Sequence, residues 1–208
     1  MKVRSRLNVV RAIEDIAVAQ SGYFTRAQAA ESGVQDFQLQ RAVAYQQIHR
    51  LGYGVYRVAG AGQDDHQDLR VMWLRLEPTS RPRARTKNPT LWVSHNSAAT
   101  VLGLGVLTPS KHEFISTTRR QLRADKAKVR VRSAGLARSE WVVRDGFAVT
   151  SPLRTLADLD ATGTDGGHLG TYLSDALHSG AIQRSDVDAL NLSQSTDALL
   201  AMADKTGS

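Results

Sequence analysis

The chain of 208 residues has the length of one or two domains, and its 41% hydrophobic and 23% charged residues are typical of a globular protein. It has no cysteine, which excludes a disulfide framework, a thiolate zinc site and a cysteine nucleophile. It also has no apolar run of membrane-spanning length and no secretory signal, so we expect a cytoplasmic protein. The net charge of +7 is uneven, with +4 over residues 1–62, +8 over 63–150 and −5 over 151–208, which indicates a polyanionic partner for the basic part.

The first sixty residues predict three helices. The first has apolar residues at helical spacing and ends at Ser21-Gly22. The second covers residues 26–32 with Thr25 as its N-cap, and the third covers 37–47 with Asp36 as its N-cap. Two helices joined by a short turn that contains a glycine are typical of a helix-turn-helix.

A β-hairpin follows, because Ile48–Leu51 and Val55–Val58 flank a Gly-Tyr-Gly turn. After three helices such a hairpin is a wing, so this part is a predicted winged helix-turn-helix. Its third helix would enter the major groove of DNA, where Gln reads adenine and Arg reads guanine, and the wing would contact phosphate or the minor groove. Docking of a protein is the alternative. The candidate DNA-binding residues are Arg26, Gln35, Gln38, Arg41, Tyr45, Arg50, Tyr53 and Arg57.

The glycine-rich segment Ala59–Gly62 is the expected hinge. It makes residues 1–60 the DNA-binding domain and residues 63–208 the C-terminal domain. A helix is expected over residues 63–78. Acidic residues lie in its first turns, where the helix dipole favours negative charge, and a metal site is the alternative role for them. The basic segment Thr79–Pro89 is expected to be a loop, either solvated or in contact with phosphate.

The middle of the chain predicts strands. Leu91–Val93 and Phe114–Ser116 are separated by a helix that ends at Gly103, and a hairpin turns at Asp145-Gly146. Seven basic residues lie between 119 and 132, and a strand over 128–132 would bury Val129 and Val131 and align three cations. This run is a solvated face, a second nucleic-acid surface or a docking site for an acidic patch of a protein partner. The residues of this candidate second basic surface are Arg119, Arg120, Arg123, Lys128, Arg130 and Arg132.

The last third of the chain predicts helices. Ser151-Pro152 is typical of a helix start, residues 169–177 form an amphipathic repeat, and serines begin two further short helices. The expected fold class is α+β, with an N-terminal winged helix-turn-helix and a larger mixed α/β C-terminal domain that ends in helices.

Three stretches of the chain carry a family resemblance. They are Gly22–Ala30 with Gly33, Leu39, Ile48 and Gly54–Tyr56; Ser94–Ala99 with Leu102–Leu104 and Pro109; and Gly146 with Val149–Pro152 and Arg154–Leu159. In order and spacing they resemble the AbiEi-type antitoxins of type IV AbiE toxin–antitoxin systems. At the end of the third helix relatives often have a basic pair and a glycine, where this chain has Tyr45-Gln46-Gln47, which bears on the strength or sequence preference of its DNA binding.

The resemblance implies an antitoxin that neutralises a nucleotidyltransferase-like toxin encoded beside it, with or without a stable complex. It also implies repression of the protein's own operon through binding of the winged helix to promoter repeats in double-stranded DNA. The C-terminal domain would carry most of the neutralisation. The alternative is a stand-alone winged-helix regulator whose C-terminal domain senses a ligand or dimerises.

Enzyme motifs are missing from the sequence. A restriction-like nuclease needs an acid two positions before a lysine, and no lysine of this chain has one. There is no glycine-rich phosphate loop, and the adjacency of Ser94 and His95 does not by itself create nucleophile–base geometry. We therefore expect no enzymatic activity, cofactor, metal site or membrane partner; a metal-dependent nuclease remnant is the third hypothesis.

Overall fold

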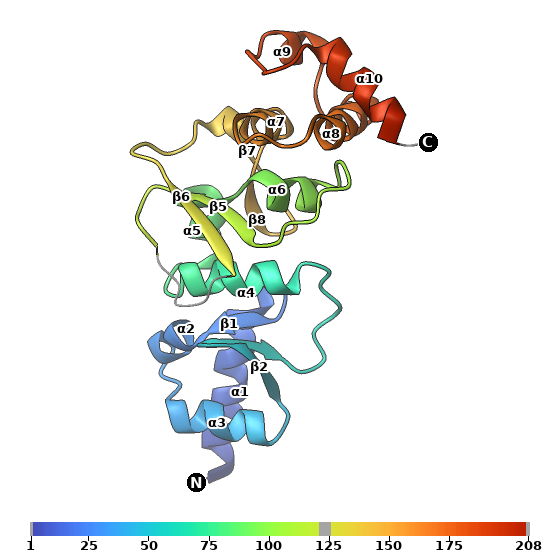
Figure 1. Ribbon diagram of the computed structural model, residues 1–208. Coiled ribbons are helices and arrows are strands. Elements are labelled where there is room, and N and C mark those ends of the chain that lie inside the picture. Colours follow the sequence, from blue (N-terminus) through green and yellow to red (C-terminus); the bar gives the residue numbers. More distant parts are fainter. Residues whose placement is uncertain (1, 121–125, 207–208) are drawn as a thin grey trace. The chain divides into compact units, whose positions relative to one another are not determined.

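The computed structural model describes residues 2–120 and 126–206, and the chain divides into two compact units, Met1–Lys87 and Asn88–Ser208 (Figure 1). We call them unit 1 and unit 2. The hinge expected at Ala59–Gly62 lies inside unit 1, because two more helices belong to the same compact unit. The fold class is mixed α and β, as expected, with a larger α/β unit that ends in helices.

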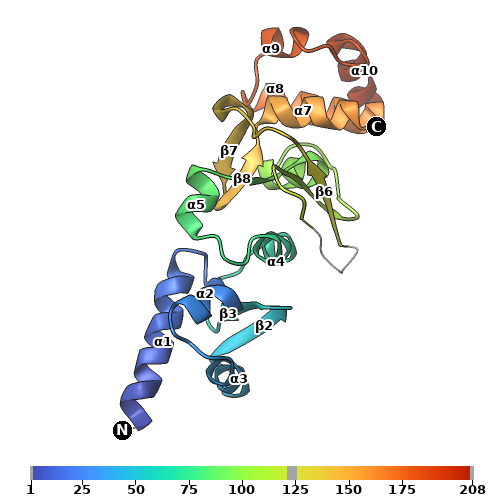
Figure 2. The same cartoon turned by 90° about the vertical axis from the view of Figure 1, so that its left-hand side faces the viewer.

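Unit 1 begins with the expected winged helix-turn-helix order. Its sheet is antiparallel with the order β1-β3-β2, and α3 lies beside β2 (Figures 1 and 2). The hairpin of β2 and β3 is the wing. These elements are α1 (Lys2–Val18), β1 (Tyr23–Thr25), α2 (Arg26–Glu31), α3 (Asp36–Ala44), β2 (Ile48–Gly52) and β3 (Val55–Val58).

Local hydrogen bonds and an apolar core position the helices of unit 1. The predicted N-cap Thr25 is confirmed: its hydroxyl accepts the N–H of Gln28 at 3.1 Å, and Oε1 of Gln28 accepts the N–H of Thr25 at 2.9 Å. The rings of Phe24 and Tyr56 stack at 5.5 Å between strands β1 and β3. Hydrogen bonds between Thr25 and Gln28 therefore fix α2 to the end of strand β1.

Two further helices, α4 (Gln67–Leu76) and α5 (Pro82–Lys87), complete unit 1. The segment Thr79–Pro89 was expected to be a basic loop, but α5 buries Arg85, which donates to the side chain of Gln20 and, at 2.8 Å, to the carbonyl of Glu77. Burial lowers the pKa of Arg85 to about 10. This arginine is an interior residue and does not reach a phosphate.

Unit 2 contains a five-stranded mixed sheet with the order β6-β5-β4-β8-β7. The pairs β4–β5 and β7–β8 are antiparallel, and β4–β8 and β5–β6 are parallel. The predicted turn at Asp145-Gly146 is confirmed, since both residues have a positive φ. The strands are β4 (Leu91–Val93), β5 (His112–Ser116), β6 (Ala127–Val131), β7 (Trp141–Arg144) and β8 (Phe147–Thr150), with a 3-10 turn, η1 (Arg138–Glu140), before β7.

The helices of unit 2 follow one another outward from the sheet. Helix α6 packs on β5 and β8, α7 packs on α6, α8 on α7, and α10 on α8 (Figure 1). Their interior contains Leu156, Leu159, Tyr172, Leu173 and Leu199. The expected start at Ser151 is confirmed by its side chain, which accepts the N–H of Arg154. The helices are α6 (His95–Leu102), α7 (Pro152–Ala161), α8 (Gly166–His178), α9 (Arg184–Asp188) and α10 (Thr196–Thr206).

Candidate nucleic-acid interface

Helix α3 is fixed by its buried side and by side-chain hydrogen bonds at its start. Leu39 and Ala42 are buried in the core of unit 1. Gln35 occupies the N-cap position, and its backbone N–H donates to Oε1 of Gln38 at 2.8 Å. The expected N-cap, Asp36, is instead the first residue of the helix. The side-chain carbonyl of Gln38 is therefore already occupied in the free protein.

The opposite side of α3 is exposed and carries an aromatic residue that the sequence analysis did not select. Phe37 is 59% exposed, and Arg41 and Ala44 are exposed as well. At about 100° per residue, these three side chains lie within about 60° of one another. The guanidinium carbon of Arg41 is 5.7 Å from the ring centroid of Tyr45, which is also exposed. The outward face of α3 is thus centred on Phe37 and Arg41 rather than on the glutamines.

Arg26, expected to bind DNA from the start of α2, is paired in the free protein. Its Nε lies 2.6 Å from Oδ1 of Asp36, and a second nitrogen contacts the other carboxylate oxygen. Hydrogen bonding and charge attraction raise the pKa of Arg26 and lower that of Asp36. Both side chains are exposed, so the pair is weak. Arg26 therefore shares its charge with Asp36 at the start of α3.

The turn of the wing projects into solvent. Tyr53 at the turn is 76% exposed, and Arg50 on β2 is exposed, with its Nε 3.4 Å from the Gly52 carbonyl. Gly54 has a φ of +70°, a conformation that glycine adopts without strain. The carbonyl of Gly54 accepts the N–H of Arg26 at 2.8 Å, and this bond ties the wing to the start of α2.

Arg57, the third predicted residue of the wing, is engaged within unit 1. Its guanidinium carbon lies 4.8 Å from the ring centroid of Tyr23, and one nitrogen donates to the carbonyl of Gly62. Arg70 approaches the same ring at 5.6 Å and forms a buried ion pair with Asp64, with an Nε–Oδ2 distance of 2.6 Å. Burial and the nearby Asp64 carboxylate raise the pKa of Tyr23 to about 12. Arg57 therefore contributes to packing, and a phosphate would have to displace these contacts.

The acidic residues before α4 are used in local bonds. Asp64 accepts the N–H of His66 at 3.0 Å besides its ion pair with Arg70, and Asp65 accepts from the side chain of Gln63 at 3.0 Å. Within residues 2–120 and 126–206, no three histidine or acidic side chains form a group that could hold a metal ion.

The boundary between the units changes how the net charge is assigned. Unit 1 contains 14 basic and 8 acidic residues, a net charge of +6, and unit 2 contains 13 basic and 12 acidic residues, a net charge of +1. Most of the net positive charge thus belongs to the unit that carries α3 and the wing. A positive unit attracts the phosphate backbone of nucleic acid.

The candidate second basic surface is not an array of free cations. Both terminal nitrogens of Arg130 donate to Oε1 of Glu113 at 3.1 Å. Arg120 donates from Nε to the hydroxyl of Ser116 at 2.9 Å. Among the others, the structure exposes Arg119 and Lys128 and half-buries Arg132, and Arg123 lies outside the described residues.

Strand β6 also lacks the expected buried valine face. It is an edge strand that pairs only with β5 in the described sheet. Val129 is half-buried, but Val131 is 53% exposed. The expectation that both valines would be buried is wrong because the end of an edge strand is not covered as a central strand is.

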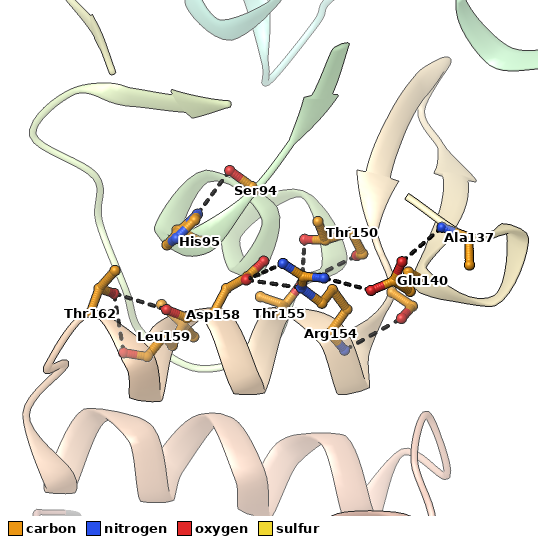
Figure 3. A network of polar contacts seen from close by, with 11 residues as sticks. Ser94, His95, Ala137, Glu140, Thr150, Arg154, Thr155, Asp158, Leu159 and Thr162 are labelled. Carbon is orange, nitrogen blue, oxygen red and sulfur yellow. Dashed lines mark hydrogen bonds and ion pairs between the residues drawn. The ribbon is translucent and has the colours of Figure 1, made fainter. Parts of the chain in front are cut away.

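Figure 3 shows a polar network around α7 of unit 2. Arg154 forms ion pairs with Glu140 at 2.5 Å and with Asp158 at 2.8 Å. At the start of α6, Nδ1 of His95 lies 2.8 Å from the hydroxyl of Ser94. Burial lowers the pKa of His95 to about 3, with a further contribution from nearby arginine and lysine charges, and burial raises the pKa of Asp158. His95 is therefore neutral at physiological pH.

The side chains of Ser94 and His95 are in contact, and the backbone of His95 has a φ of +52°. Sequence adjacency alone did not predict it. Ser94 is fully buried and His95 is 3% exposed, so a substrate could not reach the serine hydroxyl in this structure. The pair belongs to the interior of unit 2.

Comparisons with known proteins show the fold. No protein-family model and no curated protein matches the chain. Among solved structures, the chain is similar to the crystal structure of the RV2827C protein from Mycobacterium tuberculosis, with a TM-score of 0.52 and 16% identity over 97% of this chain and 78% of that one. At this identity the likeness concerns the fold alone. No helix in the described part of the chain is long and apolar enough to cross a membrane.

Proposed function

We propose that the protein is a DNA-binding repressor of its own operon and the antitoxin of an AbiE-like type IV toxin–antitoxin system. The exposed face of α3 carries the first part of this proposal, because Phe37 and Arg41 stand there opposite the buried Leu39 and Ala42. The resemblance to AbiEi-type antitoxins supports the second part. In this proposal the protein acts by binding and not by catalysis.

The shape and charge of unit 1 support the proposed DNA binding. A helix fits the major groove, where Arg41 can form paired hydrogen bonds with guanine. Arg50 and Tyr53 on the wing are exposed and suited to contact phosphates. With about four to six phosphate contacts, the logarithm of the affinity should fall with the logarithm of the salt concentration with a slope near −4 to −5.

Neutralisation of the toxin is assigned to unit 2. The stretches of unit 2 that resemble the antitoxins lie together, because α6 packs on α7, and β4 pairs with β8 through Val93 and Val149. Ser94, Leu156 and Leu159 from these stretches are fully buried. These residues therefore shape the unit, and the contacts with a toxin would come from the exposed residues around them.

Co-expression with the nucleotidyltransferase-like protein encoded beside the gene tests the antitoxin part. The full chain should restore growth, and so should Arg41→Ala, whose change lies on the DNA-facing side of unit 1. Loss of rescue by both proteins would contradict the antitoxin function. If operator binding persisted in that case, the protein would be a stand-alone regulator.

Gel-shift titration against its own promoter tests the repressor part. The wild-type chain should prefer promoter repeats over random duplex. Arg41→Ala should lose about 1–3 kcal/mol of that preference, because it removes a contact with a base edge. Arg50→Ala should weaken binding to both duplexes by a similar factor, because it removes a contact with phosphate. Equal affinity of the wild-type chain for promoter and random duplex would refute autorepression.

A further inference from the structure

Phe37 differs from every other phenylalanine of the chain. The chain has four phenylalanines, and Phe24, Phe114 and Phe147 are fully buried, whereas Phe37 is 59% exposed. Phe37 is therefore the one phenylalanine whose side chain is available for contact with a partner.

The position of Phe37 in α3 suggests what that partner is. It is the second residue of the helix, and the N-terminal residues of a recognition helix are the ones that contact base edges. Arg41 lies one turn further along the same face and is exposed. The acidic neighbour Asp36 is paired with Arg26, so its negative charge is offset. An apolar ring beside an unburied cation fits a polyanion that offers an apolar group.

The major groove of DNA offers one such group. The four base pairs differ there in their hydrogen-bond donors and acceptors, and only thymine adds an apolar methyl group at C5. A phenyl ring has no hydrogen-bonding atom, so the thymine methyl is the feature of a base edge that it can recognise.

A protein partner fits this face less well. A stable protein interface covers about 800 Å² on each side and has an apolar centre. Around Phe37 the exposed positions of α3 are Asp36, Gln40, Arg41 and Ala44, the exposed Tyr45 follows the helix, and Gln38 is half-buried. Phe37 is the one large side chain of this face without a polar atom, and charged and polar side chains surround it, which suits contact with a single small apolar group.

We propose that Phe37 is a specificity-determining residue that contacts the 5-methyl group of a thymine in the major groove, next to the base that Arg41 contacts. This proposal rests on the proposed function, since it requires that α3 binds DNA. Each bound site should therefore contain a thymine in contact with Phe37, which is absent from the DNA-binding residues expected from the sequence.

Replacement of thymine by deoxyuridine tests the contact, because it removes only the methyl group. Duplexes that bind the full-length protein are first selected from a random pool, and each thymine of the best site is then replaced in turn. The wild-type chain should lose about fourfold in affinity at one thymine position per bound α3, which corresponds to removing one buried methyl group. Replacements elsewhere in the site should have little effect.

Variants of the protein then connect this loss to Phe37. Phe37→Ala should bind the thymine and deoxyuridine duplexes equally, and Phe37→Leu should keep part of the discrimination because it keeps an apolar side chain. Tyr53→Ala is the matched control, since it removes an exposed aromatic residue of the wing. It should weaken binding to both duplexes by the same factor, because Tyr53 is proposed to contact phosphate, and should keep the fourfold difference between them. Unfolding curves should be alike for all three variants because both residues are exposed.

The outcomes separate the contact from DNA binding as such. If no sequence is enriched by the wild-type chain, the proposed function fails and this inference fails with it. If a sequence is enriched but no thymine replacement weakens binding, or if Phe37→Ala retains the fourfold difference, DNA binding stands and the thymine contact is refuted. A change in the oligomeric mass of Phe37→Ala with unchanged discrimination would assign the face to a protein interface and overturn the proposal.

Discussion

At the scale of single residues, the two wing arginines Arg50 and Arg57 have different surroundings. Arg50 is exposed on β2, whereas Arg57 lies over the Tyr23 ring and donates to the Gly62 carbonyl. Arg57→Ala should therefore lower the free energy of unfolding by about 1 kcal/mol. Arg50→Ala should change it by less than about 0.5 kcal/mol and weaken DNA binding instead. Urea unfolding and duplex titration of both variants check this, and an unchanged stability of Arg57→Ala would contradict the packing role.

His95 should make the stability of the protein depend on pH. Burial holds its pKa at about 3, whereas a histidine in the unfolded chain has a pKa near 6.5. Between these values the unfolded chain binds one more proton, so the free energy of unfolding should fall by up to about 1.4 kcal/mol for each pH unit below 6.5. His95 faces the cationic Arg130, Lys128 and Arg154, which act in the same direction.

Buried Asp158 acts in the opposite direction at lower pH, because its raised pKa gives stability that is present below the pKa of an unfolded aspartate and is lost as the pH rises through the folded value. The histidine contribution is therefore measured by difference between variants. Denaturant unfolding at pH 7.5 and 5.5 should show a smaller loss for His95→Gln than for the wild type. The exposed His168→Gln is the control, and a loss as large in His95→Gln as in the wild type would refute the assignment.

At the scale of elements, the packing of α10 on α8 depends on Gly170. A Cβ at this position would lie 2.1 Å from the backbone carbonyl oxygen of Leu199, which cannot move without moving α10. Gly170→Ala should therefore cost about 1–3 kcal/mol of stability or detach α10. In the control Gly166→Ala, on the same helix, the Cβ meets the flexible end of Met202 at 2.6 Å, and the side chain can turn away. Thermal unfolding followed by circular dichroism compares the two, and equal melting temperatures would contradict this account.

Elements with local signals could be predicted from the sequence. Thr25 and Ser151 are N-caps, Gly103 ends α6 in the left-handed conformation, and Asp145-Gly146 forms the turn of a hairpin. Helix α5 could not be predicted in this way. Its arginine Arg85 is buried by partners on other segments, and a basic stretch with a proline is read as a loop when those partners are unknown.

The helix and the hairpin that carry the candidate site could be predicted from the sequence, but the exposure and pairing of their side chains could not. A helical wheel of α3 already places Phe37 opposite Leu39, but the side chains expected to read bases were those with hydrogen-bonding groups, and phenylalanine has none. The roles of Gln38 and Arg26 depend on hydrogen bonds to Gln35 and Asp36. Such pairings depend on the turn between α2 and α3, which composition and periodicity do not define.

At the scale of the whole molecule, the division into units determines which unit carries the net positive charge and which segments fold together. The glycine-rich segment 59–62 has the composition of a linker, but the helices that follow it, α4 and α5, belong to the same compact unit as the winged helix. With these helices included, unit 1 has nearly all of the net positive charge. Glycine content predicts that a segment is flexible, but it does not predict which part of the chain the next helices pack against, and this is why the boundary expected at 59–62 differs from the boundary of unit 1.

A fragment of residues 1–87 should therefore fold on its own, whereas a fragment of residues 1–62 should not reach the same stability. The shorter fragment lacks Arg70, which lies 5.6 Å from the Tyr23 ring centroid, and it lacks the carbonyl of Ser80, which accepts from Gln28 at 2.9 Å. It also lacks Arg85, the buried partner of Gln20.

Thermal unfolding of both fragments by circular dichroism measures the difference. Residues 1–87 should show one cooperative transition, because this unit has its own core and its own buried polar pairs. Residues 1–62 should unfold at a lower temperature or without cooperativity, since Tyr23 and Gln28 lose partners while they remain on the sheet and on α2. If the two fragments unfolded at the same temperature, α4 and α5 would be dispensable and the boundary of the folding unit would lie at the glycine segment after all.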